Sequence, residues 1–473
     1  MRFEIKELDN HKDRIGYFLG CAIVFILALS SCTPRTAPSI DFDEAISVPT
    51  TVLQQAEIQI PAQPTSTPAP SVMPTSQPTV HQDLYTSAPV PTERPAVQLF
   101  PDAELVYSPT SKDFNTAHYL QEMGGFLSSY RQYLMITGWT SAADIIDRIA
   151  WENSINPRLL LALLEFQSQC VLGQPSDLEN FESALGATNY YRKDLYGQLT
   201  WAVRVLSDGY YGWITGKLTQ ISFTDGTIFR PPPNSNAGTV ALYYFFAQLG
   251  DRSLWEQALD PHQGFLTQYE DMFPGTWSRA EMVEPLLPDD LIQPALTLPF
   301  EIGEIWSYTG GPHPAFEGNG PRASLDFAPS MNESGCVSSD EWVVAMADGL
   351  VTRSDLGVVI QDLDGDGYEQ TGWVLMYVHL ADQDRVLAGT YLQAGQRIGH
   401  PSCAGGRATG THIHIVRKYN GVWIATDNAI PFVLDGWTAH DGAESYQGTL
   451  IRGDEKVTAH QFGSQISIIT RDE

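Results

Sequence analysis

The histidines in the C-terminal third of the chain are the residues whose types and spacing could do chemistry. His412 and His414 are separated by one residue, so on a β-strand both imidazoles would point to the same face. His313, Asp326 and His379 lie in the same part of the chain. Neutral imidazoles with a carboxylate are ligands that zinc takes in catalytic sites, which keep one position open for water. A His-x-His pair alone could equally be two surface histidines, so the pair needs support from its surroundings.

The segments around these histidines have the pattern of β-strands. Several stretches alternate or run apolar, and the Asp-Gly and Asn-Gly dipeptides between them are typical of hairpin turns. These stretches are EWVVAMADGLV, GVVIQDLDGDGYEQ, GWVLMYVHLA and THIHIVRKYNGVWI. We therefore expect an antiparallel all-β domain over residues 299–454, followed by a C-terminal tail over residues 455–473.

Three motifs in this β-rich part resemble those of a known family. In chain order they are GGPHPAFEGNGPRASLDFAP, MYVHLA and CAGGRATGTHIHIVRKYNGVWI. They resemble the motifs of the lysostaphin/LytM-type peptidoglycan endopeptidases, in the β-lytic metallopeptidase-like branch. In that branch the first histidine and the aspartate are further apart than in the commoner His-x-x-x-Asp form. The resemblance implies a duplicated hybrid motif-like β fold and a zinc endopeptidase that acts on the peptides of bacterial peptidoglycan.

The resemblance also implies the zinc ligands, residue by residue. It makes His313, Asp326 and His414 the ligands of Zn²⁺. Arg322 stands four residues before the aspartate, where the commoner motif has a histidine. The longer spacing accounts for this departure because His313 then supplies the ligand, whereas a different alignment would leave the site one ligand short.

His379 and His412 fall where the family has two histidines that do not bind the metal. We assign His412 as the general base and His379 as the group that stabilises the oxyanion-like intermediate, although the two roles could be exchanged. The alternative function is a non-catalytic wall-binding or regulatory protein with a degenerate LytM-type domain. Degenerate members lose metal ligands, and all three are present here.

Residues 101–298 have the periodicity of helices. Ser141 precedes the segment ADIIDRIAWENS, whose isoleucines recur at helical spacing. Asn156 followed by Pro157 has the form of an N-cap with proline at the first helical position. A later helix is expected over TVALYYFFAQL, residues 239–249.

This all-α region resembles a lytic-transglycosylase or lysozyme-like domain, through NPRLLLALLEFQSQC, an aromatic-rich stretch and NAGTVALYYFFAQL. However, Gln167 stands where that family has its catalytic glutamate, and glutamine cannot act as the acid. Glu165 lies two residues earlier on another face of the helix. We expect a non-catalytic glycan-binding module. A spacer without glycan affinity, or a glycan-cleaving domain with Glu165 as its acid, remains open.

The N-terminal part of the chain has the features of an exported lipoprotein. The apolar run IGYFLGCAIVFILALSS follows Lys12 and Arg14 and ends just before Cys32, so residues 1–32 are expected to be a signal peptide. Leu-Ser-Ser-Cys resembles a bacterial lipobox, in which the cysteine is lipidated. An uncleaved signal anchor is the alternative, and both place the rest of the chain outside the cytoplasm, on the outer face of the cell membrane or the cell surface.

The composition of the chain is consistent with export. Residues 33–100 are rich in proline, serine and threonine and are expected to form a disordered tether. The formal net charge of −29 argues against nucleic acid as a partner. An exported setting would let Cys336 and Cys403 form a disulfide inside the β domain, with Cys170 left as a free thiol. The sequence predicts no particular oligomeric state.

Other tempting features have simpler explanations. The segment from Asp362 to Gly367 resembles the start of an EF-hand loop, but Trp373 stands at position 12 where that loop has glutamate. We expect a polar hairpin turn there. His400 and His440 are expected to be structural or exposed.

Overall fold

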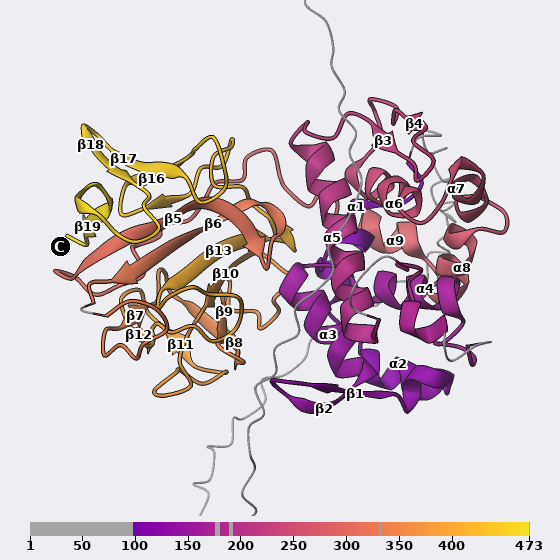
Figure 1. The fold of residues 1–473 in the computed structure, drawn as a ribbon, viewed down its shortest axis with the longest axis horizontal. Helices are drawn as coiled ribbons and strands as arrows, with labels where there is room; N and C mark the ends of the chain where they lie inside the picture. Colours follow the sequence, from indigo (N-terminus) through magenta and orange to yellow (C-terminus); the bar gives the residue numbers. More distant parts are fainter. Residues whose placement is uncertain (1–97, 176–179, 189–192, 332, 473) are drawn as a thin grey trace, which may run out of the picture. The chain divides into compact units, whose positions relative to one another are not determined.

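The helical part predicted for the middle of the chain is present in the computed structural model (Figure 1). The structure describes residues 98–175, 180–188, 193–331 and 333–472. The expected signal peptide, its Cys32 and nearly all of the expected tether lie outside these described residues. Within the described ranges, no helix is both long and apolar enough to cross a membrane.

Nine α-helices are described between Asp102 and Glu281. They are α1 (Asp102–Leu105), α2 (Thr116–Met123), α3 (Ala142–Asn153), α4 (Pro157–Ser168), α5 (Leu195–Ile214), α6 (Ala237–Ala247), α7 (Arg252–Ala258), α8 (Phe265–Met272) and α9 (Thr276–Glu281). Short elements interrupt them: η1 (Pro109–Ser111), η2 (Phe126–Ser128), η3 (Asn180–Ser183), and the hairpins β1 (Arg131–Leu134) with β2 (Gly138–Ser141) and β3 (Ile221–Ser222) with β4 (Ile228–Phe229).

The two predicted helix starts are confirmed by their capping interactions. The Ser141 hydroxyl accepts a hydrogen bond from the backbone N–H of Asp144 at the start of α3 (3.2 Å). The Asn156 side chain accepts one from the backbone N–H of Arg158 (3.0 Å), with Pro157 at the first position of α4. These side chains satisfy N–H groups that the first turn of a helix leaves without backbone partners.

The C-terminal part is mostly antiparallel β-structure, which confirms the coarse fold prediction. Its main sheet has the order β11-β8-β9-β10-β13-β6-β5-β19, with β14 paired to β13. Its strands are β5 (Ile305–Phe316), β6 (Asn319–Pro329), β8 (Gly349–Asp355), β9 (Val358–Asp362), β10 (Trp373–Val378), β11 (Tyr391–Leu392), β13 (Ile413–Tyr419), β14 (Val422–Trp423) and β19 (Ile468–Thr470).

Two smaller sheets accompany the main one. The first has the order β15-β16-β17-β18, and the second pairs β7 with β12. Their strands, with the last short helix, are β7 (Val343–Val344), β12 (Arg397–Gly399), β15 (Val433–Leu434), β16 (Trp437–Asp441), β17 (Gly448–Arg452), β18 (Glu455–Thr458) and η4 (Gln465–Ser467).

The last residues are part of the fold. Residues 455–473, expected as a tail, contain β18 and β19. In β19, Ile468 pairs with Ser307 and Ile469 pairs with Trp306 of β5. The pairing satisfies backbone groups along the outer side of β5, which would otherwise form the edge of the sheet.

The main sheet has two apolar faces because side chains alternate along its strands. Ile413 and Ile415 of β13 lie in a core within the β-rich part. Val416, on the opposite face, lies in the larger core that also contains the helices. Sheet residues in that shared core include Val358, Ile360, Val374, Met376 and Val378. The helices therefore pack against the face of the sheet that also carries His414.

Hydrogen bonds join the two regions where hairpin turns of the β-rich part meet α3. The Asn319 amide donates to the side-chain oxygen of Asn153 (2.6 Å). The Ser154 hydroxyl donates to the backbone oxygen of Gly421 (2.6 Å). All four groups are buried or half-buried, so each pair replaces water that packing has removed.

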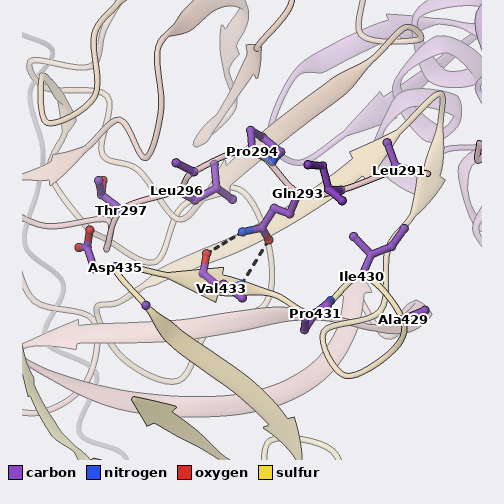
Figure 2. Close-up of a pocket in the computed structure, with 13 residues that line it drawn as sticks. Leu291, Gln293, Pro294, Leu296, Thr297, Ala429, Ile430, Pro431, Val433 and Asp435 are labelled. Carbon is purple, nitrogen blue, oxygen red and sulfur yellow. Dashed lines mark hydrogen bonds between the residues drawn. The ribbon is translucent and has the colours of Figure 1, made fainter. Parts of the chain in front are cut away.

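The segment that connects the two regions is fixed to the β-rich part. The Gln293 amide donates to the backbone oxygen of Val433 (2.7 Å), and its side-chain oxygen accepts from the backbone N–H of Val433 (3.3 Å) (Figure 2). The same oxygen also accepts a hydrogen bond from Arg417. A mostly apolar cavity of about 500 Å³ lies beside this contact. Its lining comes from residues 291–297, 429–431, 433, 435 and 436, so it shares no residue with the histidine cluster.

Candidate metal centre

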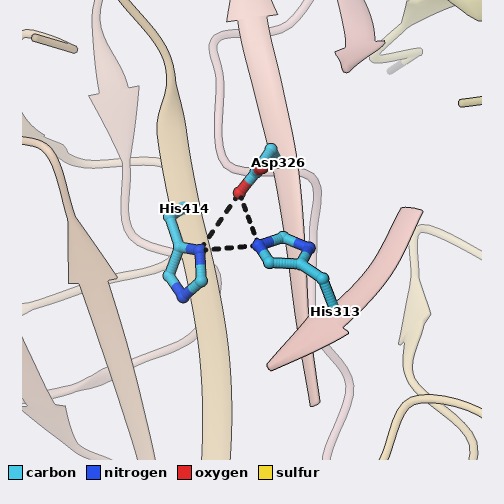
Figure 3. A group of neighbouring side chains, drawn as sticks. All are labelled: His313, Asp326 and His414. Carbon is cyan, nitrogen blue, oxygen red and sulfur yellow. Dashed lines mark hydrogen bonds and ion pairs between the residues drawn. The ribbon is translucent and has the colours of Figure 1, made fainter. Parts of the chain in front are cut away.

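Strand register brings the three predicted zinc ligands together. His414 on β13 pairs directly with Asp326 on β6. His313 lies on β5, the neighbour of β6 on its other side, where it pairs with Ser324. Three adjacent strands therefore each provide one side chain, and Figure 3 shows the three groups converging.

The three side chains are buried and lie close together. The Nε2 atom of His313 is 3.0 Å from the Nδ1 atom of His414. The Oδ1 atom of Asp326 lies 3.3 Å from the first nitrogen and 3.1 Å from the second. Such a set of two imidazole nitrogens and one carboxylate oxygen has the spacing to hold one metal ion.

Backbone carbonyls determine which imidazole nitrogens carry hydrogen. The Nδ1 atom of His313 lies 2.7 Å from the oxygen of Gly311, and the Nε2 atom of His414 lies 2.9 Å from the oxygen of Ala315. Because a carbonyl oxygen only accepts, each of these nitrogens is assigned as an N–H donor. In neutral imidazoles the opposite nitrogens then carry lone pairs.

Those two lone pairs and the Asp326 carboxylate point at one another. In a protein interior, three facing electron pairs without a proton or cation between them repel. A divalent metal ion satisfies all three, and carbonyls that orient ligating imidazoles are the usual surroundings of zinc sites. The residues therefore fit a zinc ion, on the chemistry of the donors and of the groups that hold them.

The environment of Asp326 keeps it ionised. Burial raises the pKa of this carboxyl, but the positive charges that the imidazoles of His313 and His412 carry when protonated outweigh burial and hold the pKa well below 3.8. The carboxylate also lies directly over the backbone of Gly310, where a Cβ atom would come within 2.3 Å of Oδ2. Only glycine leaves room for the ligand at that position.

The two predicted non-ligand histidines lie beside the cluster. The Nδ1 atom of His379 is 2.8 Å from the oxygen of Ala404, and the Nδ1 atom of His412 is 2.7 Å from the oxygen of Gly410. Their rings are 4.4 Å apart, and the Nε2 atom of His412 is 3.9 Å from Asp326. Both histidines therefore have Nδ1 fixed by a carbonyl, which leaves Nε2 as the nitrogen for chemistry.

Burial, followed by the neighbouring imidazoles of His412 and His414, lowers the pKa of His379 to about 3. His379 is therefore neutral at pH 7, with Nε2 as a hydrogen-bond acceptor. To donate a hydrogen bond to an oxyanion, it must first take up a proton.

Tyr446 is a neighbour of the cluster that no sequence motif indicated. Its ring stacks on the imidazole of His313, with centroids 4.1 Å apart and 20° between the planes. Its backbone N–H donates to the oxygen of Pro312, and its backbone oxygen accepts from Gly311. Tyr446 lies in a loop after β16, where neither periodicity nor a turn motif distinguishes it.

Glu317 is a second residue that sequence reasoning missed. It lies in the turn between β5 and β6, and its Oε1 atom accepts a hydrogen bond from the backbone N–H of Arg407 (2.7 Å). Arg407 belongs to the loop that includes Ala404 and Gly410, whose carbonyls hold the two non-ligand histidines. Glu317 therefore anchors the loop that positions both of them.

The disulfide stabilises the same loop. Cys336 and Cys403 are bonded, as the sequence predicts, and Cys403 directly precedes Ala404. Cys170 is a buried free cysteine, also as predicted. Burial raises the pKa of its thiol to about 12, so the thiolate is scarce at neutral pH.

Arg322, His400 and His440 lie outside the cluster. Arg322 donates to the backbone oxygen of Gly442 (2.9 Å), so it takes no place among the ligands. The Nδ1 atom of His400 contacts the oxygen of Glu341 (2.8 Å), and His440 is half-exposed.

The acidic loop forms a hairpin connection between β9 and β10. Asp362 accepts hydrogen bonds from the backbone N–H groups of Asp364, Gly365 and Gly367. The carboxylates of Asp362, Asp364 and Asp366 lie close enough together to hold a cation. Exposed acidic groups commonly lie this close together without binding a cation.

In the helical region, Glu165 has a structural partner. Its Oε2 atom accepts hydrogen bonds from the backbone N–H groups of Val171 (2.8 Å) and Leu172 (2.9 Å). The carboxylate thus holds the loop after α4. Asn236 immediately precedes α6, which begins and ends two residues earlier than the predicted helix over residues 239–249.

Comparisons with known proteins find similarity to a protease. Residues 98–286 match the family model described as LasA, N-terminal domain. The chain is 26% identical over 300 residues to Protease LasA of Pseudomonas aeruginosa strain UCBPP-PA14, and equally to that of strain PAO1. The chain is homologous to Protease LasA. This confirms the resemblance to the LytM-type peptidase family, whereas the resemblance of the helical region to lysozyme is not confirmed.

The match to Protease LasA covers 58% of this chain and 66% of the relative's length. Solved structures with a detectable likeness include the metalloprotease pseudoalterin from the deep sea, at 23% identity. That match covers 35% of this chain and 96% of the other, with a TM-score of 0.30. The catalytic domain of lysostaphin from Staphylococcus simulans is 24% identical over 25% of this chain and 86% of its own, with a TM-score of 0.18.

Proposed function

We propose that the chain is a zinc-dependent metalloendopeptidase that hydrolyses peptide bonds of bacterial cell-wall peptidoglycan. The observation that carries this proposal is the convergence of His313, His414 and Asp326, with each imidazole oriented by a carbonyl and two further histidines alongside. Homology to a protein named as a protease supports hydrolysis of peptide bonds. Peptidoglycan as the substrate follows from the family that the motifs resemble.

In this proposal His313, Asp326 and His414 hold Zn²⁺. When bound, the metal supplies a Lewis acid that polarises the scissile carbonyl and acidifies water toward neutral pH. The side chain of His412 is 15% exposed and that of His313 is 3% exposed, so His412 is the more accessible to a substrate.

His412 accepts the proton of the attacking water at Nε2. Its Nδ1–H remains hydrogen-bonded to the oxygen of Gly410, and this bond stabilises the positive charge that the ring then carries. The same nitrogen can later give the proton to the leaving amine. His379 is neutral and donates its Nδ1–H to the oxygen of Ala404, so its Nε2 atom can only accept a hydrogen bond, and the ring stabilises an oxyanion only after protonation.

The proposal extends to the parts of the chain that supply context. It includes export, a lipid anchor at Cys32 and peptidoglycan peptides as partners, with no role for nucleic acid. It also includes a duplicated hybrid motif-like fold for the β-rich part and a non-catalytic, lysozyme-like, glycan-binding role for the helical part. The backbone hydrogen bonds of Glu165 support the non-catalytic role.

The test is digestion of purified peptidoglycan by the full chain, with zinc content measured and released fragments analysed by mass. The proposal expects one zinc per chain, fragments with newly exposed amines, and loss of both after chelation. A folded, zinc-loaded chain that releases nothing would favour a non-catalytic wall-binding protein. Fragments cut at glycosidic bonds would assign the activity to the helical part.

A further inference from the structure

The hairpin of β1 and β2 presents a group of apolar side chains to solvent. Tyr133 pairs directly with Trp139 across the two strands, with their rings edge to face and centroids 5.8 Å apart. Met135, Ile136 and Thr137 form the turn, and the hydroxyl of Thr137 hydrogen-bonds to that of Thr140 (2.6 Å). The exposed fractions are 59% for Tyr133, 92% for Met135, 67% for Ile136 and 66% for Trp139. Figure 1 shows the hairpin at the margin of the helical region, beside α2 and α3.

Only the inner face of the hairpin is used to hold it in place. The Gln132 side chain accepts a hydrogen bond from the backbone N–H of Tyr196 (3.1 Å), and Leu134 packs against the helical core. Thr140 is buried on the same face. Exposure of four large apolar side chains at one tip is unusual for a surface without a partner, so the outer face is a candidate contact surface.

The outer side chains are ordered by polarity from tip to base. The aliphatic Met135 and Ile136 are outermost, the Tyr133 and Trp139 pair follows, and Arg131 lies nearest the base, where its guanidinium donates to the oxygen of Trp139 (3.2 Å). A bilayer surface has the same order of preferences: hydrocarbon for aliphatic groups, the headgroup level for tryptophan and tyrosine, and phosphates for arginine. We propose that this hairpin inserts its tip into the surface of a lipid bilayer.

Charges near the hairpin permit this approach. Glu122 and Asp144 are separated by a stretch of sequence without an acidic residue, in a chain whose net charge is −29. Asp144 and Asp147 do lie near the inner face, where they share a cavity with Thr137 and Thr140. Because Arg131 is the one basic residue on the hairpin, insertion is driven by apolar contact and persists at high salt.

The geometry favours a lipid surface over a sugar. The Tyr133 and Trp139 rings meet at 76°, so the pair does not form one flat platform for stacking on a glycan. The outermost side chains are aliphatic and offer sugar hydroxyls no hydrogen bond.

Hydrogen–deuterium exchange of the full chain tests the proposal, with and without vesicles of phosphatidylethanolamine and phosphatidylglycerol. Amides of residues 131–141 should exchange on the order of tenfold more slowly with vesicles, at low and at high salt. The double variant Met135→Ser/Ile136→Ser should lose this protection. The matched control Met282→Ser/Ile292→Ser removes side chains that are 77% and 79% exposed elsewhere, and should keep it.

Each other outcome overturns the proposal. No protection by vesicles excludes lipid insertion, whatever holds the N-terminal part of the chain, because the signal is read at the hairpin itself. Protection by soluble peptidoglycan fragments, and not by vesicles, assigns the surface to glycan. Protection without lipid that grows with protein concentration assigns the surface to contact with a second copy of the chain. Protection without lipid that does not depend on protein concentration assigns the surface to contact with the chain's own residues 1–97. Unchanged exchange in α3 and α4 shows that a variant is folded, and Met135→Ser alone serves if the double variant is not.

Discussion

Sequence motifs led us to expect a cell-wall enzyme fold in both the β-rich and the helical region, but the two regions differ in what their polar groups have left to bind. In the helical region the Glu165 carboxylate accepts two backbone hydrogen bonds, and Gln167 stands where an acid would be needed. In the β-rich region, His313 and His414 use one nitrogen each on a carbonyl and turn the other toward Asp326. The candidate site in the β-rich region is distinguished from the Glu165 carboxylate by electron pairs that converge in a buried place without a partner.

The largest expected effect is the loss of a ligand in the β-rich region. His414→Ala removes one of three proposed protein ligands, so zinc content and peptidoglycan hydrolysis should both fall to background. Metal analysis and fragment release from purified peptidoglycan measure the two. His440→Ala, a half-exposed histidine outside the cluster, is the control and should keep both. A fully zinc-loaded His414→Ala protein would contradict the ligand assignment.

A smaller effect is expected for the proposed base. His412→Ala leaves the three ligands in place, so zinc should stay while the rate falls roughly 10²–10⁴-fold, the usual worth of general acid–base catalysis. His412 and His414 lie on either side of Ile413, the first residue of β13. Misfolding of this strand would therefore affect both variants alike. Loss of zinc in His412→Ala and its retention in His414→Ala would reverse their roles.

A third prediction concerns the loop anchor that sequence did not reveal. Glu317→Ala removes the acceptor for the Arg407 N–H, so the loop carrying the Ala404 and Gly410 carbonyls should loosen. A shift of about 1 Å in catalytic groups costs up to about 100-fold in rate, with zinc unchanged. Glu317→Gln keeps an oxygen at that place and should restore most of the activity. Equal loss in both variants would mean that the charge matters and the hydrogen bond does not.

The smallest effect is expected in the helical region. Glu165→Ala leaves the Val171 and Leu172 N–H groups without their acceptor and should lower the free energy of unfolding by about 1–2 kcal/mol. Hydrolysis of peptidoglycan should not change. Denaturant unfolding measures the first and fragment release the second, with the exposed Glu281→Gln as the control. A large loss of glycan cleavage would make Glu165 an acid after all.

Local signals in the sequence were sufficient for many of the elements. Ser141 and the pair Asn156-Pro157 marked helix starts because capping depends on residues next to one another. Alternation along THIHIVRKY marked a strand, and motifs pointed to the five candidate site residues, which lie close together in the structure. β19 could not be found this way because it is short and its pairing with β5 depends on contacts far along the chain.

The rest of the site depends on register and on loops. Tyr446 reaches His313 from a loop, and Glu317 reaches Arg407 across a turn, and neither contact leaves a periodic pattern. The tautomers of the ligands depend on the oxygens of Gly311 and Ala315, which any residue type could provide. The types of side chain therefore predict the candidate ligands, whereas the orientation of these side chains depends on the backbone around them and can be read only from the structure.

X-ray absorption at the zinc edge of the purified full chain tests the central claim most directly. The account predicts one zinc per chain bound by two imidazole nitrogens and one carboxylate oxygen of the protein, with the remaining position taken by water. In Asp326→Asn, the carboxylate contribution should be lost and the affinity for zinc should fall. A folded chain that binds no zinc, or that binds zinc through sulfur or through more than two histidines, would contradict it.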